Sequence, residues 1–583
     1  MSQISIRQRE YRDRADFAPQ WPAFLRRVYL ARGVEQNEAL SLGLSQLLSP
    51  HQLLGMEAAV DLLLETLDAG QSILVVGDFD ADGATSCALM LRALTAMGFP
   101  SVDYLVPNRF DYGYGLTPEI VEVAAAREPG LIITVDNGIS SVQGVLAARD
   151  HGIRVLVTDH HLPGEQLPDA DAIVNPNQPG CAFPEKSLAG VGVAFYLMLA
   201  LRARLRQRGA FSEAQPEPNL ASLLDLVALG TVADVVPLEY NNRILVHEGL
   251  RRIRRGRCSP GLLALLDVAG RDHSRVVASD LGFAAGPRLN AAGRLEDISL
   301  GIECLLTDDP DAAARMAAEL DSINRQRRTI EQEMGEQADV SLSLMQEKLQ
   351  DGLPAGLCLH DAQWHQGVIG ILASRLKERF HRPVIIFADA GSDARGRPQL
   401  KGSARSIPGF HIRDALALVE SRHPGLLPRF GGHAMAAGLS LAVEDFPRFQ
   451  ALFESVVEAD IGDVVGQQRI HTDGPLASSE LSLETAELLR EHGPWGQGFP
   501  EPAFEGVFEP VSQRLVAGKH LKLVLSMPGG GELVDAIAFN VDTAAWPDES
   551  ARRLRLVYRP DRNEFRGRVS LQLMVEHLEL CLD

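Results

Sequence analysis

Carboxylate and imidazole side chains gather in four short motifs in the first half of the chain. The motifs hold Asp78, Asp80 and Asp82 in GDFDADG, Asp136 in VDNG, the run Asp159-His160-His161, and Asp234 in GTVADVVPL. Carboxylate oxygens together with an imidazole suit Mg²⁺ or Mn²⁺. Two such ions can lower the pKa of a bridging water and neutralise phosphate oxygens. The motifs therefore predict a two-metal site that hydrolyses a phosphoester.

The pattern around the first three motifs predicts a sheet that would bring them together. From residue 70 to about 235, β-branched runs alternate with helical stretches, which is typical of a parallel sheet with crossover helices. We expect strands over 72–76, 131–135 and 154–158, with helices over 84–97 and 142–150. Each strand leads into an acidic motif, and open α/β sheets bind ligands at the carboxyl ends of their strands. Alternation along an extended GDFDADG would direct its three carboxylates to one side.

Two other interpretations of the acidic motifs are weaker. Any one of these acids alone is more often a helix N-cap or a turn residue, but all of them at strand ends together disfavour that explanation. A nucleotide-binding Rossmann fold would need G-x-G-x-x-G after a strand, and the chain has neither that sequence nor a Walker A motif. A metal-dependent hydrolase fits better.

The remainder of the chain predicts further domains. Residues 187–270 show helical periodicity, and 300–349 are dominated by a long charged helix of the kind that connects two lobes. A turn at 351–354 precedes a second strand, helix and strand, which predicts a second α/β domain. From about residue 460, four strand-like runs separated by Gly, Pro and Asp predict a small β-barrel or sandwich.

Length and composition indicate a folded protein of about three or four domains. Of the 583 residues, 45% are hydrophobic and 23% charged, which excludes a fibrous or a largely disordered protein. The longest nearly apolar run, 189–201, is shorter than the roughly 20 residues that a membrane span needs. The first residues mix Arg with Glu and Asp and lead into no apolar stretch, so we expect no secretory signal and a cytoplasmic protein.

Cysteine spacing and net charge narrow the function further. Six scattered cysteines without a C-x-x-C pair argue against a disulfide framework and a structural zinc site. A net charge of -21 is wrong for a protein that coats nucleic acid, so any polyanion must bind locally. All but six of the 56 basic residues are Arg, whose planar fork suits phosphate.

The four acidic motifs resemble those of the DHH phosphoesterase superfamily. Further segments resemble its single-stranded-DNA-specific 5′ to 3′ exonucleases, namely PNRFDYGYGL, GFAAGPRLNAAGR, WHQGVIGILASRL, KGSARS, FGGHAMAAG and GPWGQGFPEPAF. The resemblance covers about residues 70–580 and implies an α/β fold with a parallel-sheet DHH domain. The implied order is an N-terminal helical segment (1–69), the DHH catalytic domain (70–300), a connecting helix (301–350), a DHH-associated nucleic-acid-binding domain (351–458) and an OB-fold (459–583).

The resemblance also implies roles for the acidic motifs. It makes metal ligands of Asp80, Asp82, Asp136, His160 and Asp234, with Asp78 as a further candidate. Asp136 would bridge the two metals, Asp159 would orient the histidine, and His161 would contact the scissile phosphate. The superfamily's small pyrophosphatases carry a histidine ligand where this chain has Val76, which predicts a weaker or differently completed first metal site.

Substrate contacts follow from the same resemblance. Arg109, Ser403 and Arg405 look like a clamp for a 5′-terminal phosphate, since an Arg fork with a hydroxyl suits that group. Gly432 and His433 would let the backbone approach the polyanion. The single strand would run along Arg288, Asn290 and Arg294, although a surface salt bridge is an alternative role for either arginine.

The implied function is processive hydrolysis of single-stranded DNA in recombination and repair. Aromatic residues make up 6% of the chain, so we expect recognition of the backbone and weak sequence specificity. A single-stranded-DNA-binding protein and a RecQ-type helicase are the implied partners, and we expect a monomer. An enzyme for short oligonucleotides or pyrophosphate is disfavoured because such enzymes generally lack the β-rich C-terminal domain. A catalytically dead replication scaffold is disfavoured because every expected acid and histidine is present.

Overall fold

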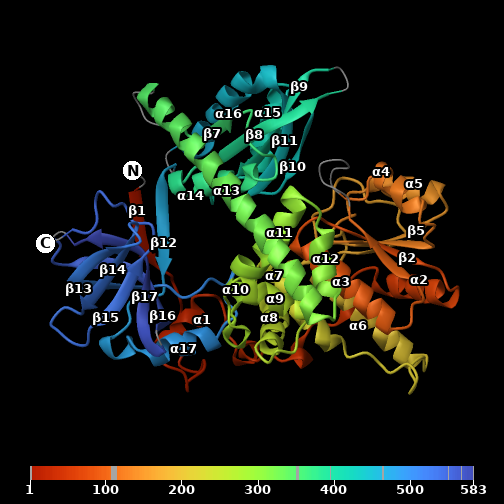
Figure 1. Ribbon diagram of the computed structural model, residues 1–583, viewed down its shortest axis with the longest axis horizontal. Helices are drawn as coiled ribbons and strands as arrows, with labels where there is room; N and C mark the ends of the chain where they lie inside the picture. The colour runs from red at the N-terminus through yellow and green to blue at the C-terminus, as the bar shows by residue number, and fades with distance from the viewer. Residues whose placement is uncertain are drawn as a thin grey trace. The chain divides into compact units, whose positions relative to one another are not determined.

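The computed structural model of the chain describes residues 3–106, 115–348, 353–393, 396–462, 465–548, 550–565 and 567–581. It consists of two units (Figure 1). The larger unit holds Gln8–Asp321 and His471–Asp583, and the smaller unit holds Met1–Arg7 and Ser322–Ile470. The division runs through the long helix α13 (Pro310–Lys348), so the predicted domain boundaries stay a prediction.

A five-stranded parallel sheet forms the centre of the larger unit's first part, in the order β3-β2-β4-β5-β6. Its strands are β2 (Ile73–Gly77), β3 (Val102–Leu105), β4 (Leu131–Val135), β5 (Arg154–Thr158) and β6 (Ala172–Val174). The Val, Ile and Leu runs of β2 and β4 are buried throughout, as expected for a parallel sheet covered on both faces. The predicted strands are confirmed, whereas the short edge strands β3 and β6 lacked a pattern long enough to find.

Helices cover both faces of this sheet. Figure 1 shows α4 (Pro118–Ala125) and α5 (Val142–Asp150) on one side, with α3 (Ala81–Ala96) and α6 (Gly190–Gln207) on the other. Both α3 and α6 pack against α7 (Leu224–Ala233), and nearly all the residues of α7 are buried. A helix that is apolar all round belongs inside a core, and α7 is accordingly buried as far as Thr231, while its last residues, Val232 and Ala233, are half-buried.

More helices complete this part of the larger unit. They are α1 (Ala23–Leu30), α2 (Met56–Asp68), α8 (Tyr240–Ile253), α9 (Pro260–Val268), α10 (Ala278–Asp280), α11 (Gly286–Leu295) and α12 (Ser299–Leu306). The long charged helix predicted to dominate 300–349 is confirmed as α13, and the short separate helix α12 precedes it. Thr307 is extended and Pro310 starts α13, where a missing N–H costs nothing.

The smaller unit contains a mixed five-stranded sheet in the order β10-β11-β9-β8-β7. The strands are β7 (Leu357–His360), β8 (Val384–Ser392), β9 (Pro398–Arg405), β10 (Arg429–Gly432) and β11 (Ala436–Ala442). Its helices are α14 (Ile369–Phe380), α15 (Ile412–Arg422) and α16 (Phe446–Ile461). The predicted helical N-terminal segment instead begins with a strand, β1 (Gln3–Gln8), which pairs with β12 (Gln467–Thr472).

The C-terminal part of the larger unit is a closed five-stranded barrel, in the order β13-β14-β15-β17-β16. Its strands are β13 (Phe504–Val516), β14 (His520–Ser526), β15 (Val534–Ala538), β16 (Leu554–Phe565) and β17 (Arg568–Leu580). This closed five-stranded architecture is that of an OB-fold. The four predicted strands are confirmed. The sequence missed β13 because Pro510 and a register shift next to it interrupt its alternation.

Every helix in the described part of the chain is too short or too polar to cross a membrane.

A buried ion pair joins the N-terminal segment of the larger unit to the chain that enters the barrel. Arg32 donates two hydrogen bonds to the carboxylate of Asp473, at 2.7 and 3.0 Å. Their side chains are only 1% and 0% exposed. The same carboxylate accepts from the Ala503 N–H at 3.1 Å, so it also fixes the start of the barrel. Asp473 has a second cationic partner in Arg9, 3.5 Å away, but removal of the Asp473 charge would leave the buried Arg32 without its carboxylate.

Asp473→Asn should therefore lower the free energy of unfolding by about 3 kcal/mol. Urea denaturation followed by tryptophan fluorescence would measure the loss, because the Trp495 ring centroid lies 5.3 Å from the Arg32 guanidinium carbon. Asp169→Asn is the matched control, since it removes one partner of the exposed Arg149–Asp169 pair and should cost less than about 1 kcal/mol. Equal losses in the two variants would contradict the structural importance of the buried pair.

Candidate metal centre

The four acidic motifs converge at the carboxyl ends of the parallel strands. His160 Nε2 lies 3.1 Å from Asp136 Oδ1 and 3.4 Å from Asp234 Oδ2. Potential ligand atoms lie within 4.8 Å of one another in three overlapping groups: Asp78, Asp80 and Asp136; Asp82, His160 and Asp234; and Asp136, His160 and His161. Asp136 and His160 each belong to two groups. This sharing is what a pair of neighbouring metal ions would require.

The first motif is not an extended strand, so the predicted alternation of its three carboxylates is wrong. Asp80 is instead the N-cap of α3, and its Oδ1 accepts from the N–H groups of Asp82 and Gly83 at 2.9 and 3.1 Å. The cap turns the chain into the helix, and Asp82 consequently lies in the first helical turn. Asp78 and Asp80 join one ligand group and Asp82 another.

Asp82 is anchored by the start of a second helix. Its carboxylate accepts from the N–H groups of Gly190 and Val191 at 2.7 and 2.9 Å, at the N-terminus of α6. Burial and the charge of Asp80 nevertheless raise the pKa of Asp82 to about 7, because the backbone donors only partly offset them. The site is therefore a place where a carboxylate charge is costly until a cation arrives.

Burial and neighbouring negative charge oppose ionisation still more strongly at Asp136 and Asp234. Burial raises the pKa of both carboxyls well above the usual range, and the charges of Asp82 and Asp80 raise each of them further. A divalent cation would reverse these shifts by giving the crowded oxygens a shared counter-charge. The donor set of carboxylates and one or two imidazoles thus fits Mg²⁺ or Mn²⁺.

The backbone at Asp136 is held in an uncommon conformation. Its φ is +61°, in the left-handed region that few residues other than glycine adopt. The next residue, Asn137, donates from Nδ2 to the carbonyls of Val76 at 3.1 Å and Val135 at 2.9 Å, which ties the ends of β2 and β4 together. A Cβ on Gly190 would lie 2.6 Å from the Asp136 Cβ, so only glycine lets α6 approach this closely.

Asp159 organises the two histidines. Its Oδ1 accepts from the N–H groups of His160 and His161 at 2.7 and 3.0 Å, and lies 2.8 Å from His161 Nδ1. Its Oδ2 accepts from the Ile139 N–H at 2.9 Å. Burial by itself would lower the pKa of His161, but the hydrogen bond and the charge of Asp159 raise it. The ring that Asp159 contacts most closely is therefore that of His161.

Two asparagines support the histidine run, and sequence reasoning missed both. Asn175 donates from Nδ2 to the His161 carbonyl at 3.0 Å, and Asn177 donates to the His160 carbonyl at 2.6 Å. They follow β6 in the sequence NPN. A polar run directly after a short apolar stretch was the only available signal.

Helix α11 supports the metal-binding turn from outside. Asn290 Oδ1 accepts from the Ala81 N–H at 2.7 Å, and a Cβ on Gly293 would lie 1.8 Å from the Phe79 carbonyl oxygen. Arg288 is buried and pairs with Asp321 at 2.6 Å. These contacts give Asn290 and Arg288 structural roles, and their predicted contacts with DNA stay predictions. Arg294 lies partly exposed near the end of the same helix.

The predicted phosphate clamp lies in the smaller unit. Arg405 and Ser403 share β9, and Arg405 donates to the Ser403 Oγ at 3.1 Å. A Cβ on Gly370, in the first turn of α14, would lie 2.9 Å from both side chains. Burial lowers the pKa of Arg405. An arginine, a hydroxyl and a helix N-terminus together form a suitable site for a phosphate.

The other predicted clamp residues surround this strand or lie outside the described residues. Ala436 of β11 pairs with Arg405, so the turn between β10 and β11 lies at the end of β9. Gly432 ends β10 and His433 follows it in that turn, and both are exposed. Arg109 lies outside the described residues.

Family models match the chain in three successive segments. The DHH family N-terminal domain matches residues 72–231, the DHHA1 domain matches 353–459, and the RecJ OB domain matches 472–577. The first match includes β2, β4 and β5 and the acidic motif that follows each of them. The second includes β9 with Arg405, and the third includes most of the barrel.

Individual relatives resemble the chain over nearly its whole length. The single-stranded-DNA-specific exonuclease RecJ of Dickeya dadantii (strain 3937) is 57% identical over 558 residues, which are 96% of either protein. The crystal structure of RecJ from Thermus thermophilus in complex with Mn²⁺ matches with a TM-score of 0.79 at 30% identity, and covers 100% of this chain and 80% of that one. Its complex with Mg²⁺ matches with a TM-score of 0.75 at 28% identity, over 100% and 79%. The chain belongs to the RecJ family of exonucleases.

Proposed function

We propose that this chain is a single-stranded-DNA-specific 5′ to 3′ exonuclease that uses two metal ions and releases 5′-mononucleotides. The carrying observation is the cluster of Asp and His ligand atoms at the ends of the parallel strands, in a chain of the RecJ family. The related structures from T. thermophilus hold Mn²⁺ or Mg²⁺, and the same ions are the proposed cofactors. When bound, they would supply an activated water and positive charge for the phosphate oxygens.

The chain's own residues divide the work around that chemistry. The ligands would be Asp78, Asp80, Asp82, Asp136, His160 and Asp234. Asp136 and His160 each belong to two ligand groups, and of these only Asp136 has the two oxygens that would let it serve both ions. Asp159 holds His161 through Nδ1 and favours the protonated ring. His161 would then donate a hydrogen bond to a scissile phosphate oxygen as negative charge develops there.

Selection of the strand end would fall to the clamp. Arg405 and Ser403 would bind the 5′-terminal phosphate, with Arg109, Gly432 and His433 as further predicted contacts. The remaining predicted contacts with the strand are Arg294, the half-buried Asn290 and the buried Arg288. The cellular role that we propose is DNA recombination and repair in the cytoplasm, by a monomer that works with a single-stranded-DNA-binding protein and a RecQ-type helicase.

A direct test uses purified protein with Mn²⁺ or Mg²⁺ and four matched substrates: single-stranded DNA, single-stranded RNA, blunt duplex DNA and a dinucleotide. With the label at the 3′ end, the proposal expects progressive shortening of single-stranded DNA from its 5′ end, and none with chelator. Cleavage of the dinucleotide alone would overturn it in favour of a small-substrate enzyme. DNA binding without cleavage would favour a scaffold.

Asp136→Asn should reduce kcat on single-stranded DNA at least about a thousandfold, because it removes the bridging charge. Asparagine tolerates the left-handed backbone at this position better than alanine does, so loss of activity can be separated from backbone strain. Circular dichroism and DNA binding in chelator should remain unchanged. Asp150→Asn, an exposed position on α5, is the matched control, and near-normal turnover of Asp136→Asn would refute the ligand assignment.

The crowded carboxylates should also destabilise the metal-free protein. A carboxyl whose pKa is raised by folding costs stability as the pH rises above its unfolded pKa of 3.8, and the cost is complete above its folded pKa, which is about 7 for Asp82. In chelator at about pH 8, Asp136→Asn should therefore raise Tm by about 3 °C. The gain should shrink at about pH 5, where the carboxyls become protonated.

Bound metal should reverse the order of the two melting temperatures. With Mn²⁺ present, the unmodified protein should show the larger rise in Tm, because Asp136 then contributes a ligand. Thermal scans with Mn²⁺ and with chelator measure both effects. A metal-free variant that melts below the unmodified protein would contradict the repulsion that the structure implies.

Arg405→Gln should weaken capture of the phosphorylated end. We expect KM to rise about 30-fold on 5′-phosphorylated strands and to change little on 5′-hydroxyl strands, because only the former present a charged partner to the guanidinium. Arg413→Gln removes an exposed charge from α15 of the same unit and is the control. An equal loss on both kinds of end would show that Arg405 does not recognise the terminal phosphate.

A further inference from the structure

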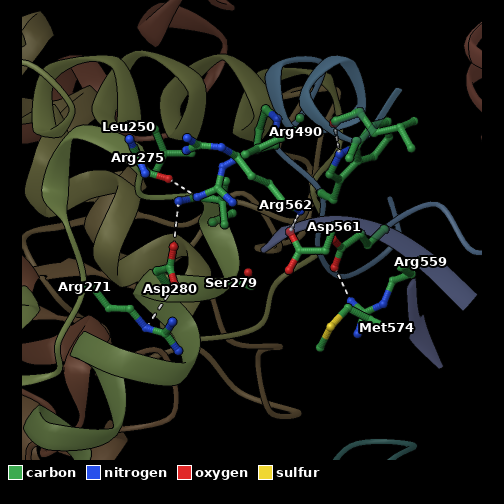
Figure 2. A pocket seen from close by; sticks show the side chains of 18 of the residues that line it. Leu250, Arg271, Arg275, Ser279, Asp280, Arg490, Arg559, Asp561, Arg562 and Met574 are labelled. Atoms are coloured by element: carbon green, nitrogen blue, oxygen red, sulfur yellow. Dashed lines mark hydrogen bonds and ion pairs between the residues drawn. The ribbon is translucent and has the colours of Figure 1, made fainter. Parts of the chain in front are cut away.

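A cavity of about 750 Å³ lies within the larger unit, between its helices and the barrel. Figure 2 shows Leu250, Arg271 and Asp280 of the helical part on one side and Arg559 and Met574 of the barrel on the other. Strands β16 and β17 supply the barrel residues that line it, and β14 and β15 supply none. The second and third strands form the usual nucleic-acid-binding face of an OB-fold, so this cavity lies on a different face.

Most of the charges that line the cavity are paired. Arg271 lies 3.3 Å from Asp280, and Arg275 and Arg562 both pair with Glu564. Arg559 pairs with Glu501. These pairs neutralise much of the walls and leave Arg254 and Arg490, against the carboxylate of Asp561, to decide the charge of the interior.

Two lining arginines, Arg254 and Arg490, have no carboxylate partner within the described residues. Arg254 donates from Nε to the Val276 carbonyl at 2.9 Å, and Arg490 donates to the Arg275 carbonyl, so backbone contacts orient both groups. Burial lowers the pKa of Arg254, and the charge of Arg490 lowers it further. Two neighbouring, partly buried guanidinium groups that repel one another would be stabilised by a shared anion.

An exposed aromatic ring lies at the same cavity. Phe283 is 79% exposed and belongs to a π-helical turn, Leu281–Ala285. π-turns are rare and frequently occur at functional sites. A nucleic acid base that stacks on this phenyl ring would remove two apolar faces from water, and the flat ring is a surface of the right kind.

The π-helical turn connects the cavity to the metal centre. A Cβ on Gly282 would lie 3.2 Å from Val232 Cγ1, and one on Gly286 would lie 3.1 Å from Ala233 Cβ. The turn therefore packs on the last residues of α7, directly before Asp234. The helix that follows it, α11, supports the first acidic motif through Asn290. The turn that carries Phe283 and the residues that hold the metal centre thus belong to directly packed elements of the same unit.

We propose that this cavity is a second binding subsite for single-stranded DNA, in which a base stacks on Phe283 and a backbone phosphate pairs with Arg254 and Arg490. The inference rests on the proposed exonuclease function, and concerns the part of the strand that follows the nucleotide being removed. Stacking on Phe283 needs a base with an open face, which a duplex does not offer. The subsite would therefore favour single strands.

The test compares long and short strands in the full-length protein. For strands of about 20 nucleotides, Phe283→Ala should raise KM about tenfold with little change in kcat, since stacking contributes about 1–3 kcal/mol per base. For strands of about three nucleotides KM should not change, because the proposal places the cavity beyond the nucleotides at the metal centre. Phe283→Trp keeps an aromatic face and should restore the KM on long strands.

Arg490→Gln tests the phosphate contact. It should weaken binding of long strands. The slope of log Kd against log salt concentration should fall by about the amount that one phosphate contact contributes. Arg255→Gln is the control, because Arg255 is exposed and adjacent to Arg254 in the chain but does not line the cavity. Its salt dependence should match that of the unmodified protein.

Equilibrium binding in chelator separates failure of this proposal from failure of the proposed function. The exonuclease proposal fails if the unmodified protein binds long strands but does not degrade them when metal is supplied. In that case, weaker binding of long strands by Phe283→Ala would still support the subsite. Unchanged binding and KM in both variants would overturn the subsite. Equal changes in KM on long and short strands would also overturn it. So would substitutions that weaken binding of an acidic peptide but not of DNA.

Discussion

Repulsion between buried carboxylates is the constraint on which the rest of the structure depends. Asp82, Asp136 and Asp234 are held close together at positions where burial and mutual charge oppose their ionisation. Contacts elsewhere in the fold must offset this crowding, because without metal the site favours separation or protonation of its acids. The elements around it are accordingly those that prevent separation: two helix starts, a left-handed residue and a set of close backbone contacts.

Each of these supports acts on a different acid. The start of α6 holds the Asp82 carboxylate, Asn137 fixes the strand ends next to Asp136, and Asn290 of α11 holds the turn between Asp80 and Asp82. The loop after Asp234 is fixed from the barrel side, because the Leu238 N–H donates to the Gln497 carbonyl at 2.7 Å. The segment that leads into the barrel therefore also positions the metal centre. This contact gives a physical reason for one chain to carry both parts in a single unit.

The sequence predicted the parallel sheet and the meeting of its acidic motifs because both follow from strand direction. Strands β4 and β5 were found with their correct bounds, since buried parallel strands are unbroken runs of Val, Ile and Leu. The predicted conformation of the first motif was wrong because three alternating acids are compatible with an extended segment as well as with a capped helix. Only the contacts of Asp80 with the N–H groups of Asp82 and Gly83 decide between them.

What the sequence could not supply were contacts between distant positions. Asn175 and Asn177 belong to an ordinary turn sequence, and their contacts with the histidine run depend on how β6 lies beside β5. Arg288 likewise belongs to a motif that favours DNA contact, yet the fold buries it against Asp321. An arginine motif specifies charge, whereas only the tertiary structure specifies which group meets that charge.

The overall charge then limits how this protein can hold a polyanion. A net charge of -21 gives DNA no general attraction to this protein, and salt screens each charge beyond about a Debye length, so attraction must come from arginines within a few ångströms of a phosphate. Arg405 is desolvated beside a helix N-terminus, and Arg254 and Arg490 are desolvated beside one another. Such sites act only on a phosphate that can enter them. Under the proposed function, an acidic chain with a few recessed arginines would hold a flexible single strand and its terminal phosphate, while a stiff duplex would meet mainly the repulsive surface.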